Sequence, residues 1–421
     1  MRLRLDYGTT GLLADFPDSR TTIIEPVYIS AAADIRRTLT TALQKPMGKR
    51  PLRELARPGQ KIAISVCDIT RAQPRQAMLE ALFSEMPGVR LQDATILIAT
   101  GTHRRNSEEE IERMLGREFA RGCRILCHNS RDAESLVHVG DTRNGVRILL
   151  NREWVKSDFK ITTGFVEPHF FAGFSGGPKM VAPGLAGLET VLELHNAARI
   201  GHPNATWGIT EGNPIHDDVR EIARMTGVDF ALDVTLNRDQ EITAAFAGDL
   251  FQEHAAACTV AKQNVMRAVP GSFDVVVTTN SGYPLDQNLY QAVKGMSAAA
   301  KIVKDGGTII CAAECRDGLP NHGAYGEILA SRRSPRELLD MITTPGYSRP
   351  DQWQVQIQAQ IQLKAKVVLK SDRLHPDQIR AAHFEPVDDV AGAVDEALRR
   401  AGPDATLCVL PQGPQTIPYV G

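Results

Sequence analysis

The stretch Lys61-Ile62-Ala63-Ile64-Ser65-Val66-Cys67 is a short apolar run that ends in the more polar segment Asp68-Ile69-Thr70-Arg71. A helical pattern over Arg75–Ser84 follows it. Apolar runs of roughly four to eight residues, each followed by a helical pattern, recur along most of the chain. This alternation is typical of α/β proteins with largely parallel sheets, whose strands are buried on both faces and therefore apolar throughout.

The same criterion places further elements along the chain. The expected strands are Lys61–Cys67, Ala94–Thr100, Phe159–Thr163, Phe273–Thr279, Gly307–Ala312 and Thr406–Leu410. The expected helices are Arg75–Ser84, Ser107–Leu115, Gly187–Ile200, Leu250–Arg267, Asp286–Met296 and Val387–Ala401. The glutamine-rich stretch Gln352–Gln362 is expected to form a helix with a polar face.

A Pro-Gly turn in Ala268-Val269-Pro270-Gly271-Ser272 marks the best domain boundary, because it separates a helical stretch from a new strand. We expect an N-terminal α/β domain over residues 1–267 and a smaller C-terminal α/β domain over residues 272–402. The proline-containing tail, residues 403–421, is expected to fold back onto the N-terminal domain. Each domain should contain a largely parallel sheet flanked by helices.

The bulk composition is that of an ordinary globular protein. The chain has 421 residues, of which 43% are hydrophobic and 23% charged, and its net charge is -2. A net charge this small gives no general attraction to nucleic acid or to an anionic membrane. No apolar run approaches the roughly 18 residues of a membrane span, and the first residues lack the apolar core of a signal peptide. The seven scattered cysteines suit reduced thiols, so we expect a cytoplasmic protein that binds neither nucleic acid nor a membrane.

Chemically reactive side chains follow several of the expected strands. Ligands of open α/β sheets bind at the carboxyl ends of strands, so we expect these side chains to meet in a cleft between the two domains. The residues concerned are Asp68, Thr70, Arg71, His103, His169 and Lys179 in the first domain, and Tyr290, Gln291 and Lys294 in the second.

Most of these residues also have a purely structural interpretation. Asp68 and Thr70 suit the cap of a turn or of the next helix, and Arg71 suits a solvent-exposed cation. His103 shortly precedes Ser107, which begins a capping box at the start of a helix. Only the joint pattern favours a functional site over separate structural roles.

His195 has the strongest structural alternative. It follows Leu188, Val191 and Leu192 at helical spacing, which places it on the apolar face of the expected helix. A single histidine on such a face is more often a core residue than a ligand.

The glycine-rich segment Gly173–Met180 superficially resembles a phosphate-binding P-loop. It departs from that motif because Pro178 stands where the motif has glycine, and Met180 stands where it has serine or threonine. Its glycines would still let the backbone approach a flat or phosphorylated ligand closely. No G-x-G-x-x-G dinucleotide fingerprint occurs at a strand–helix junction. A zinc site built from His103, His169 and His195 stays open as an alternative, although no carboxylate ligand stands out.

Taken together, the motifs resemble the nickel-pincer lactate racemase family, whose members include 2-hydroxy-acid racemases and epimerases. They span most of the chain and keep the family's order and approximate spacing. The matching segments are Asp68-Ile69-Thr70-Arg71, Gly101-Thr102-His103, Glu167-Pro168-His169, Ser175-Gly176-Gly177-Pro178-Lys179, Leu194-His195-Asn196 and Tyr290-Gln291-Ala292-Val293-Lys294-Gly295.

The resemblance implies a nickel-pincer nucleotide, a pyridinium mononucleotide whose two sulfur-containing arms hold nickel. The N-terminal domain would bind this cofactor, and cofactor-biosynthesis enzymes would supply it. By the family's pattern, Lys179 tethers one arm, His195 is the protein ligand of nickel, and Asp68, Ile69, Thr70 and Arg71 contact the cofactor. His103 and His169 match the two catalytic histidines, and Gln291 and Lys294 match the substrate-binding positions.

The activity that the resemblance implies is racemisation of a 2-hydroxy acid by proton-coupled hydride transfer through a 2-keto acid. Histidines suit the proton transfers because their pKa lies near neutrality. Lactate or another short aliphatic 2-hydroxy acid is the favoured substrate, since no additional basic cluster accompanies Lys294. The alternatives are racemisation or epimerisation of malate or a sugar acid, a zinc-dependent hydrolase, and a non-catalytic protein that binds an organic acid.

Overall fold

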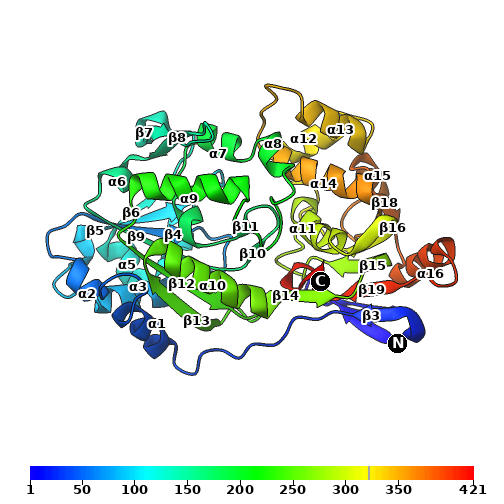
Figure 1. The fold of residues 1–421 in the computed structure, drawn as a ribbon, viewed down its shortest axis with the longest axis horizontal. Coiled ribbons are helices and arrows are strands. Elements are labelled where there is room, and N and C mark those ends of the chain that lie inside the picture. Colours follow the sequence, from blue (N-terminus) through cyan, green and yellow to red (C-terminus); the bar gives the residue numbers. More distant parts are fainter. Residues whose placement is uncertain (321–322) are drawn as a thin grey trace. The chain divides into compact units, whose positions relative to one another are not determined.

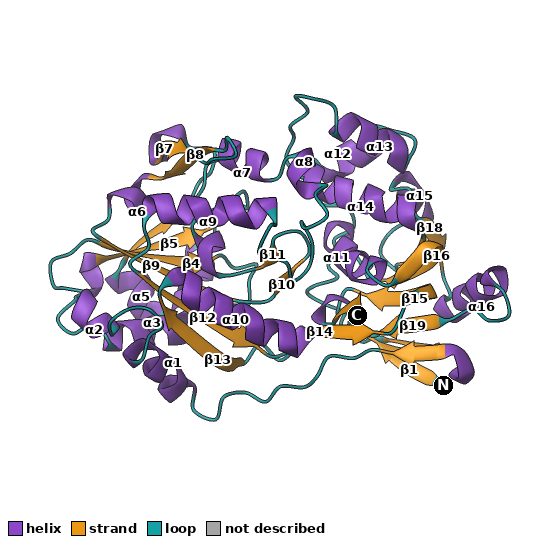
Figure 2. Ribbon diagram, viewed as in Figure 1, coloured by secondary structure: helices purple, strands orange, loops and turns teal. Residues whose placement is uncertain are grey.

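The computed structural model describes residues 1–320 and 323–421, and it divides the chain into two compact units. The central unit comprises Tyr28–His195 and His202–Lys262. The C-terminal unit comprises Met1–Val27, Asn196–Gly201 and Gln263–Gly421. Each unit contains a six-stranded sheet with helices against it, so the expected α/β class is confirmed (Figures 1 and 2).

The sheet of the central unit has the strand order β13-β12-β9-β4-β5-β6. All its pairings are parallel except that of β12 with β13. Every residue of β4 is buried, which explains why all of its residues except Ser65 are apolar. The strands are β4 (Ile62–Cys67), β5 (Ala94–Ala99), β6 (Arg124–Cys127), β9 (Phe159–Phe165), β12 (Phe230–Leu236) and β13 (Ile242–Gly248).

Helices pack against the sheet of the central unit. One core joins the sheet to α1 (Ile35–Gln44), α2 (Leu52–Leu55), α3 (Arg75–Ser84), α4 (Glu108–Leu115) and α5 (Arg117–Gly122). The remaining elements are α6 (Arg152–Lys156), α7 (Leu188–Leu194), α9 (Pro214–Thr226), α10 (Leu250–Val265), the 3-10 turn η4 (Gly177–Met180), and the hairpins β7–β8 (Leu136–Asp141, Arg147–Asn151) and β10–β11 (Pro168–His169, Gly173–Phe174).

The sheet of the C-terminal unit is parallel throughout, in the order β18-β17-β16-β15-β19-β3. Its strands are β3 (Thr21–Ile23), β15 (Phe273–Thr279), β16 (Val303–Ala312), β17 (Lys366–Lys370), β18 (Glu385–Val387) and β19 (Leu407–Leu410). The other elements are the hairpin β1–β2 (Arg2–Leu5, Leu12–Asp15), the pair β14–β20 (Met266–Val269, Ile417–Val420), and the helices α8 (Ala197–Ile200), α11 (Leu289–Ala300), α12 (Tyr325–Ala330), α13 (Pro335–Ile342), α14 (Gln352–Lys364), α15 (Pro376–Ala381) and α16 (Val390–Ala401).

The expected domain limits need correction at both ends of the chain. Residues 1–27 and the tail 403–421, assigned to the N-terminal domain from the sequence, belong to the C-terminal unit. The physical reason is strand pairing: β19 pairs with β15 on one side and with β3 on the other, and β20 pairs with β14. Short strands of this kind carry too little local signal to reveal their partners.

Two expected helices also differ from the structure. The helix expected over 187–200 is interrupted after Leu194, and Asn196 caps a second short helix by accepting a hydrogen bond from the Arg199 amide at 3.0 Å. The helix expected over 352–362 is present as α14, but only Gln360 of its glutamines is exposed, so they do not form the expected polar face. Gln352, Gln354, Gln356 and Gln358 are all buried.

Among the described residues, no helix is long and apolar enough to cross a membrane.

Candidate functional site

The segment after β4 is held in place by two buried side chains that the sequence did not single out. The Arg75 guanidinium donates to the carbonyl oxygens of Cys67 at 2.7 Å, Gln73 at 3.0 Å and Arg71 at 2.7 Å, and also to that of Asp68. Gln73 accepts from the Cys67 amide at 2.7 Å and donates to Thr163 Oγ1 at 2.8 Å. The buried side chains of Arg75 and Gln73 therefore fix the backbone conformation of the expected Asp68–Arg71 site segment.

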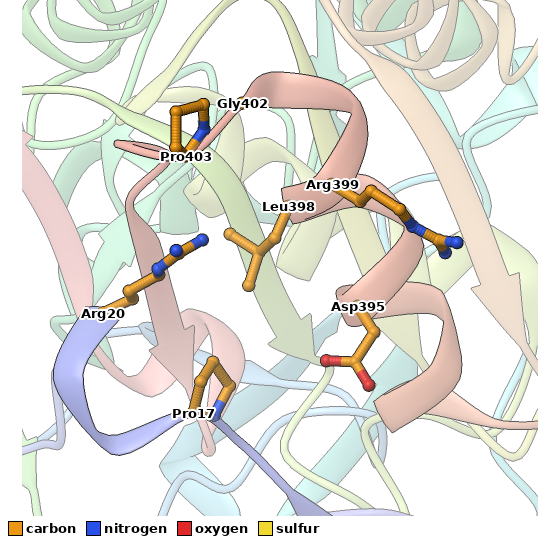
Figure 3. Close-up of a pocket in the computed structure, with 7 residues that line it drawn as sticks. All are labelled: Pro17, Arg20, Asp395, Leu398, Arg399, Gly402 and Pro403. Atoms are coloured by element: carbon orange, nitrogen blue, oxygen red, sulfur yellow. The ribbon is translucent and has the colours of Figure 1, made fainter.

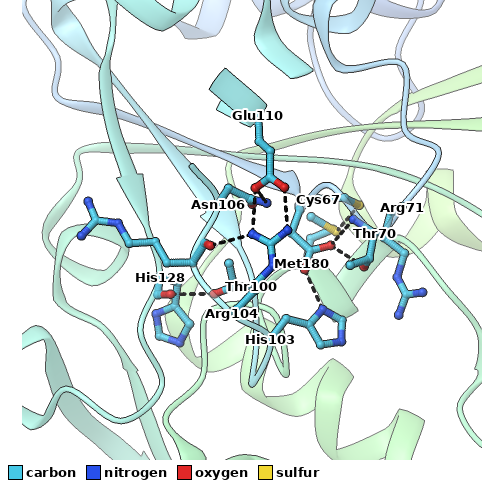
Figure 4. A network of polar contacts seen from close by, with 12 residues as sticks. Cys67, Thr70, Arg71, Thr100, His103, Arg104, Asn106, Glu110, His128 and Met180 are labelled. Carbon is cyan, nitrogen blue, oxygen red and sulfur yellow. Dashed lines mark hydrogen bonds and ion pairs between the residues drawn. The ribbon is translucent and has the colours of Figure 1, made fainter. Parts of the chain in front are cut away.

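Asp68 and His103 form a close pair. Asp68 is 2% exposed, and its Oδ2 lies 2.6 Å from Nδ1 of His103 (dashed line at the His103 ring in Figure 4). Its Oδ1 accepts from the hydroxyl of Thr70 at 2.6 Å and from the Thr70 amide at 3.1 Å. Burial alone would raise the pKa of Asp68, but the His103 contact and the Thr70 hydroxyl outweigh burial and lower it. An ionised Asp68 can only accept, so His103 Nδ1 donates, and in the neutral form of the ring Nε2 presents the lone pair.

His169 is oriented differently. Its Nδ1 accepts from the backbone amides of Ala172 at 3.3 Å and Phe171 at 3.5 Å, so a neutral His169 carries its proton on Nε2. The two expected catalytic histidines are therefore not equivalent: His103 presents an acceptor, and His169 presents a donor.

Phe171 is the residue around which three expected site residues gather. Its ring centroid lies 4.5 Å from that of His169, 5.2 Å from that of His195, and 5.9 Å from Nζ of Lys179. The sequence around His169 does not indicate this role for Phe171, since an aromatic residue in an apolar loop gives no distinct sequence signal.

Gly184 links the segment that carries His103 to η4, the turn that carries Lys179, by backbone hydrogen bonds. Its carbonyl accepts from the Gly101 amide at 3.0 Å, and its own amide donates to the Lys179 carbonyl at 3.1 Å. A Cβ at this position would lie 2.9 Å from Ala99 Cβ and 3.0 Å from the Lys179 carbonyl oxygen, so only glycine fits without displacement.

The hairpin that carries His169 is supported by the loop before α9. Asn213, which is fully buried, donates from Nδ2 to the Phe171 carbonyl at 2.9 Å and caps α9 through Oδ1. The Gly208 amide donates to the Gly173 carbonyl at 3.0 Å. In the sequence, Asn213 before Pro214 signals only a helix start.

His195 ends α7 instead of lying within a longer helix. Its Nδ1 donates to the Val191 carbonyl at 2.7 Å, so in the neutral ring Nε2 carries the lone pair. Burial, assisted by the charge of Lys179, lowers the pKa of His195 to about 4. A neutral imidazole with an oriented Nε2 has the form in which histidine binds metals.

Gln291 and Lys294 lie in the C-terminal unit, one turn apart on α11. Asn288 caps this helix by accepting from the Gln291 amide at 3.1 Å. Gly295 packs so closely on the end of β15 that a Cβ there would lie 2.0 Å from the Thr279 carbonyl oxygen. The close packing fixes the helix face that carries both residues.

Two surface hollows differ in how close they lie to these residues. One, of about 400 Å³, lies between Arg20 and α16 in the C-terminal unit and contains none of the expected site residues (Figure 3). The other, of about 560 Å³, is lined by Ile69 and Arg71 together with Arg113 of α4. The second hollow thus borders the Asp68–Arg71 segment, and Arg71, Arg75 and Arg113 all line it.

Within residues 1–320 and 323–421, no group of three or more His, Cys, Asp and Glu side chains is arranged to hold a metal ion. His103, His169 and His195 are thus not gathered as the zinc site considered from the sequence. If one of these histidines binds a metal ion, the other donor atoms to that ion would have to come from a bound group.

These features define an α/β enzyme with a carboxylate-oriented histidine at a strand end. Residues 7–208 match the model of the lactate racemase N-terminal domain, and residues 269–417 match that of the lactate racemase C-terminal domain. The chain belongs to the lactate racemase family, and it is accordingly an isomerase of the racemase type.

Individual relatives agree with this assignment. The lactate racemase of Thermoanaerobacterium thermosaccharolyticum is 34% identical over 99% of this chain and 98% of its own length. That of Lactiplantibacillus plantarum is 39% identical over 89% of each chain. The solved lactate racemase apoprotein from T. thermosaccharolyticum superposes with a TM-score of 0.92 at 33% identity, covering 99% of this chain and 100% of that one. A Thermotoga maritima protein shares the fold, with a TM-score of 0.70 at 18% identity, 92% of this chain and 98% of its own.

Proposed function

We propose that this protein racemises a short aliphatic 2-hydroxy acid, with lactate the favoured substrate, using a nickel-pincer nucleotide tethered to Lys179. The observation that carries the proposal is the gathering of His169, Lys179 and His195 around Phe171 in one unit. Family membership supports the choice of substrate, since both curated relatives compared above are lactate racemases.

The residues present fit this cofactor. His195 offers a neutral, oriented Nε2, and an imidazole is a suitable ligand for square-planar nickel. Gly176 and Gly177, both with positive φ, give the turn that carries Lys179 a backbone conformation that other residues rarely adopt. Ile69, Thr70 and Arg71 would contact the nucleotide, with Arg71 and Arg113 suited to an anionic group.

Lys179 would hold the cofactor covalently. Condensation of its ε-amine with a thiocarboxyl arm forms a C–N bond and releases water, which leaves a thioamide. The expected mass gain is therefore that of the cofactor less one water. Cofactor-biosynthesis enzymes would be the required partners.

When bound, the nickel-pincer nucleotide supplies an acceptor for the hydride that leaves C2 of the hydroxy acid. His103 Nε2 accepts the hydroxyl proton, and Asp68 stabilises the resulting imidazolium. His169 would donate a hydrogen bond from Nε2 to the same substrate oxygen. To act as the second base, it would have to carry its proton on Nδ1 in place of the contacts from the Phe171 and Ala172 amides. As the planar 2-keto acid is reduced, the protonated His103 would return the proton to the substrate oxygen, and reduction at the opposite face would give the other enantiomer.

Gln291 and Lys294 would bind the substrate carboxylate. A cation and an amide on one face of α11 suit a single carboxylate that must be held through both half-reactions. A malate or sugar-acid substrate would need further polar partners, so we favour a monocarboxylate.

The experiment is co-expression of the chain with cofactor-building enzymes, followed by intact mass, nickel content and chiral analysis of lactate. We expect a mass gain on the peptide that contains Lys179, near-stoichiometric nickel, and conversion of each lactate enantiomer to a mixture. Lys179→Ala should abolish the mass gain, whereas Lys156→Ala, at an exposed lysine of the same unit, should not. An unmodified mass without nickel, while another family member loads normally, would overturn the cofactor proposal. A loaded protein inactive on lactate would direct the screen to other 2-hydroxy acids and overturn the substrate.

A further inference from the structure

A buried polar cluster lies directly beneath the turn that carries Lys179. It consists of Asp233 on β12 and of Glu253 and His254 on α10, and none of the three is more than 4% exposed. None of them matches a family motif noted in the sequence. An aspartate inside a strand that is otherwise buried and apolar needs a physical explanation.

Three glycines make room for this cluster. Gly164 on β9 pairs with Asp233 on β12, and a Cβ at Gly164 would lie 2.8 Å from Asp233 Oδ1. A Cβ at Gly176 would lie 2.9 Å from Asp233 Oδ2, and one at Gly177 would lie 2.4 Å from the His254 ring. The glycine-rich segment is thus shaped to the carboxylate and imidazole below it, as well as to any ligand above it.

Hydrogen bonds connect the cluster to the turn. The Gly177 amide donates to Asp233 Oδ2 at 2.6 Å, at the first position of η4. His254 Nε2 donates to the Ser175 carbonyl at 2.8 Å. The Lys179 amide in turn donates to the Gly176 carbonyl at 3.1 Å. Two hydrogen bonds therefore connect β12 to Lys179: one from the Gly177 amide to Asp233, and one from the Lys179 amide to the Gly176 carbonyl.

Glu253 gives the cluster its charge balance. Burial, and then the neighbouring charge of Asp233, hold the pKa of Glu253 well above its ordinary value, so Glu253 keeps its proton near neutrality. A protonated Glu253 can sit beside Asp233 without repulsion. Burial also raises the pKa of Asp233, to about 7, and any negative charge of the pair falls on Asp233, whose Oδ2 accepts from the turn.

We propose that Asp233 is a positioning residue for cofactor attachment: by accepting from Gly177, it holds the turn at the geometry that presents the Lys179 amine. The inference rests on the proposed tether at Lys179, and it concerns a residue that touches neither cofactor nor substrate. Glu253 and His254 complete the support.

The first test uses the apoprotein and needs no cofactor. Hydrogen exchange of residues 172–181 should be at least about tenfold faster in Asp233→Ala than in the wild type. Asp233→Asn, which keeps an oxygen acceptor for Gly177, should stay within about threefold of the wild type. Glu253→Gln should do so too, since it replaces a neutral carboxyl by a neutral amide.

Asp218→Ala is the matched control. Asp218 is equally buried in the same unit, but it accepts from Thr142 and Asn144 at the β7–β8 connection. This variant should speed exchange at residues 140–147 and leave residues 172–181 unchanged. If Asp233→Ala does not fold, Asp233→Ser takes its place, because its hydroxyl is too short to reach Gly177.

The second test measures the rate of mass gain at Lys179 under identical loading. We expect Asp233→Ala to gain mass at least about tenfold more slowly than Asp218→Ala, with Asp233→Asn restoring the rate. Equal rates and equal exchange in the wild type and Asp233→Ala would overturn the positioning role. Absence of any mass gain in the wild type would instead overturn the tether itself, and the exchange result would still decide whether Asp233 holds the turn.

Discussion

At the residue scale, the environment of each site histidine differs in a way that its sequence position does not reveal. His103 is oriented by a carboxylate, His169 by two backbone amides, and His195 by a backbone carbonyl of its own helix. These contacts decide which ring nitrogen carries the proton, and hence whether a histidine presents an acceptor or a donor.

Asp68→Asn tests the orientation of His103. An asparagine amide can donate to Nδ1, which would move the His103 proton to Nε2 and remove the acceptor. We expect kcat to fall by about 10²- to 10⁴-fold, the usual range for loss of a general base, with a much smaller change in KM. Racemisation rates from both lactate enantiomers, measured on protein with verified cofactor content, check this.

The control for this prediction is Asp158→Asn. Asp158 also accepts a backbone hydrogen bond, from the Lys61 amide at 2.9 Å, but at the opposite end of β4. Its kcat should stay within about twofold of the wild type. An Asp68→Asn enzyme with wild-type kcat would remove His103 from the role of base.

The sequence identified the chemical residues of the candidate site but not the residues that hold them. Asp68, His103, His169, Lys179 and His195 stand out because each follows a strand or a motif. Their supports include Gln73, Arg75, Phe171, Gly184, Asn213 and Asp233. These act through long-range contacts, such as that of Asp233 with Gly177, and no local pattern encodes a partner that far away in the chain.

At the element scale, buried strands and capped helices were predictable, and interruptions were not. Strands such as Phe273–Thr279 and helices such as Arg75–Ser84 match the structure because burial on both faces and helical periodicity are local signals. The break at His195 depends on the Asn196 cap, and an asparagine within an apparently continuous helical pattern is a weak signal. The burial of α14 depends on carbonyl partners for its glutamines, which are set by the tertiary fold.

Asn213→Asp tests how α9 supports the His169 hairpin. The new carboxylate still caps α9, but it places an oxygen against the carbonyl oxygens of Phe171 and Ile209, which now accept from the amide. We expect a loss of about 1–3 kcal/mol in the free energy of unfolding and a fall in kcat of about tenfold or more. Calorimetry and steady-state kinetics give the two values.

Asn151→Asp separates stability from activity in this experiment. Asn151 is also a buried cap, of α6, and its amide contacts His128 instead of the hairpin. It should lose comparable stability and keep its kcat. If both variants lost kcat equally, the effect of Asn213 would be one of general stability.

At the scale of the whole molecule, the chain passes from the central unit to the C-terminal unit directly after His195. The central unit ends its first segment at His195, and the next residue begins a segment that belongs to the C-terminal unit. There Gln356 of α14 donates to the Ala197 carbonyl at 2.8 Å. Both sheets carry candidate residues beyond the carboxyl ends of parallel strands, the usual place for ligands in open α/β folds.

The central unit concentrates buried titratable groups, which predicts how its stability depends on pH. Burial is the first cause that lowers the pKa of His128, of His195 and His254 (each of the latter to about 4), and of His216 well below its ordinary value. Burial likewise raises the pKa of Asp233 to about 7 and that of Glu253 well above its ordinary value.

Between about pH 5 and pH 6, unfolding of the apoprotein should therefore take up protons. His195, His216 and His254 gain a proton each as they reach water, and the two carboxyls lose one each, so at least about one proton is bound on balance, with His128 acting in the same direction. Stability should rise with pH across this window, by at least about 1.4 kcal/mol per pH unit at about 1.4 kcal/mol per proton. His254→Gln, whose amide can still donate to the Ser175 carbonyl, removes one histidine and should lower the slope by about 1.4 kcal/mol per pH unit. Calorimetric unfolding of both proteins from pH 5 to pH 6 measures it; a slope of zero or of opposite sign in the wild type would mean that the carboxyls dominate.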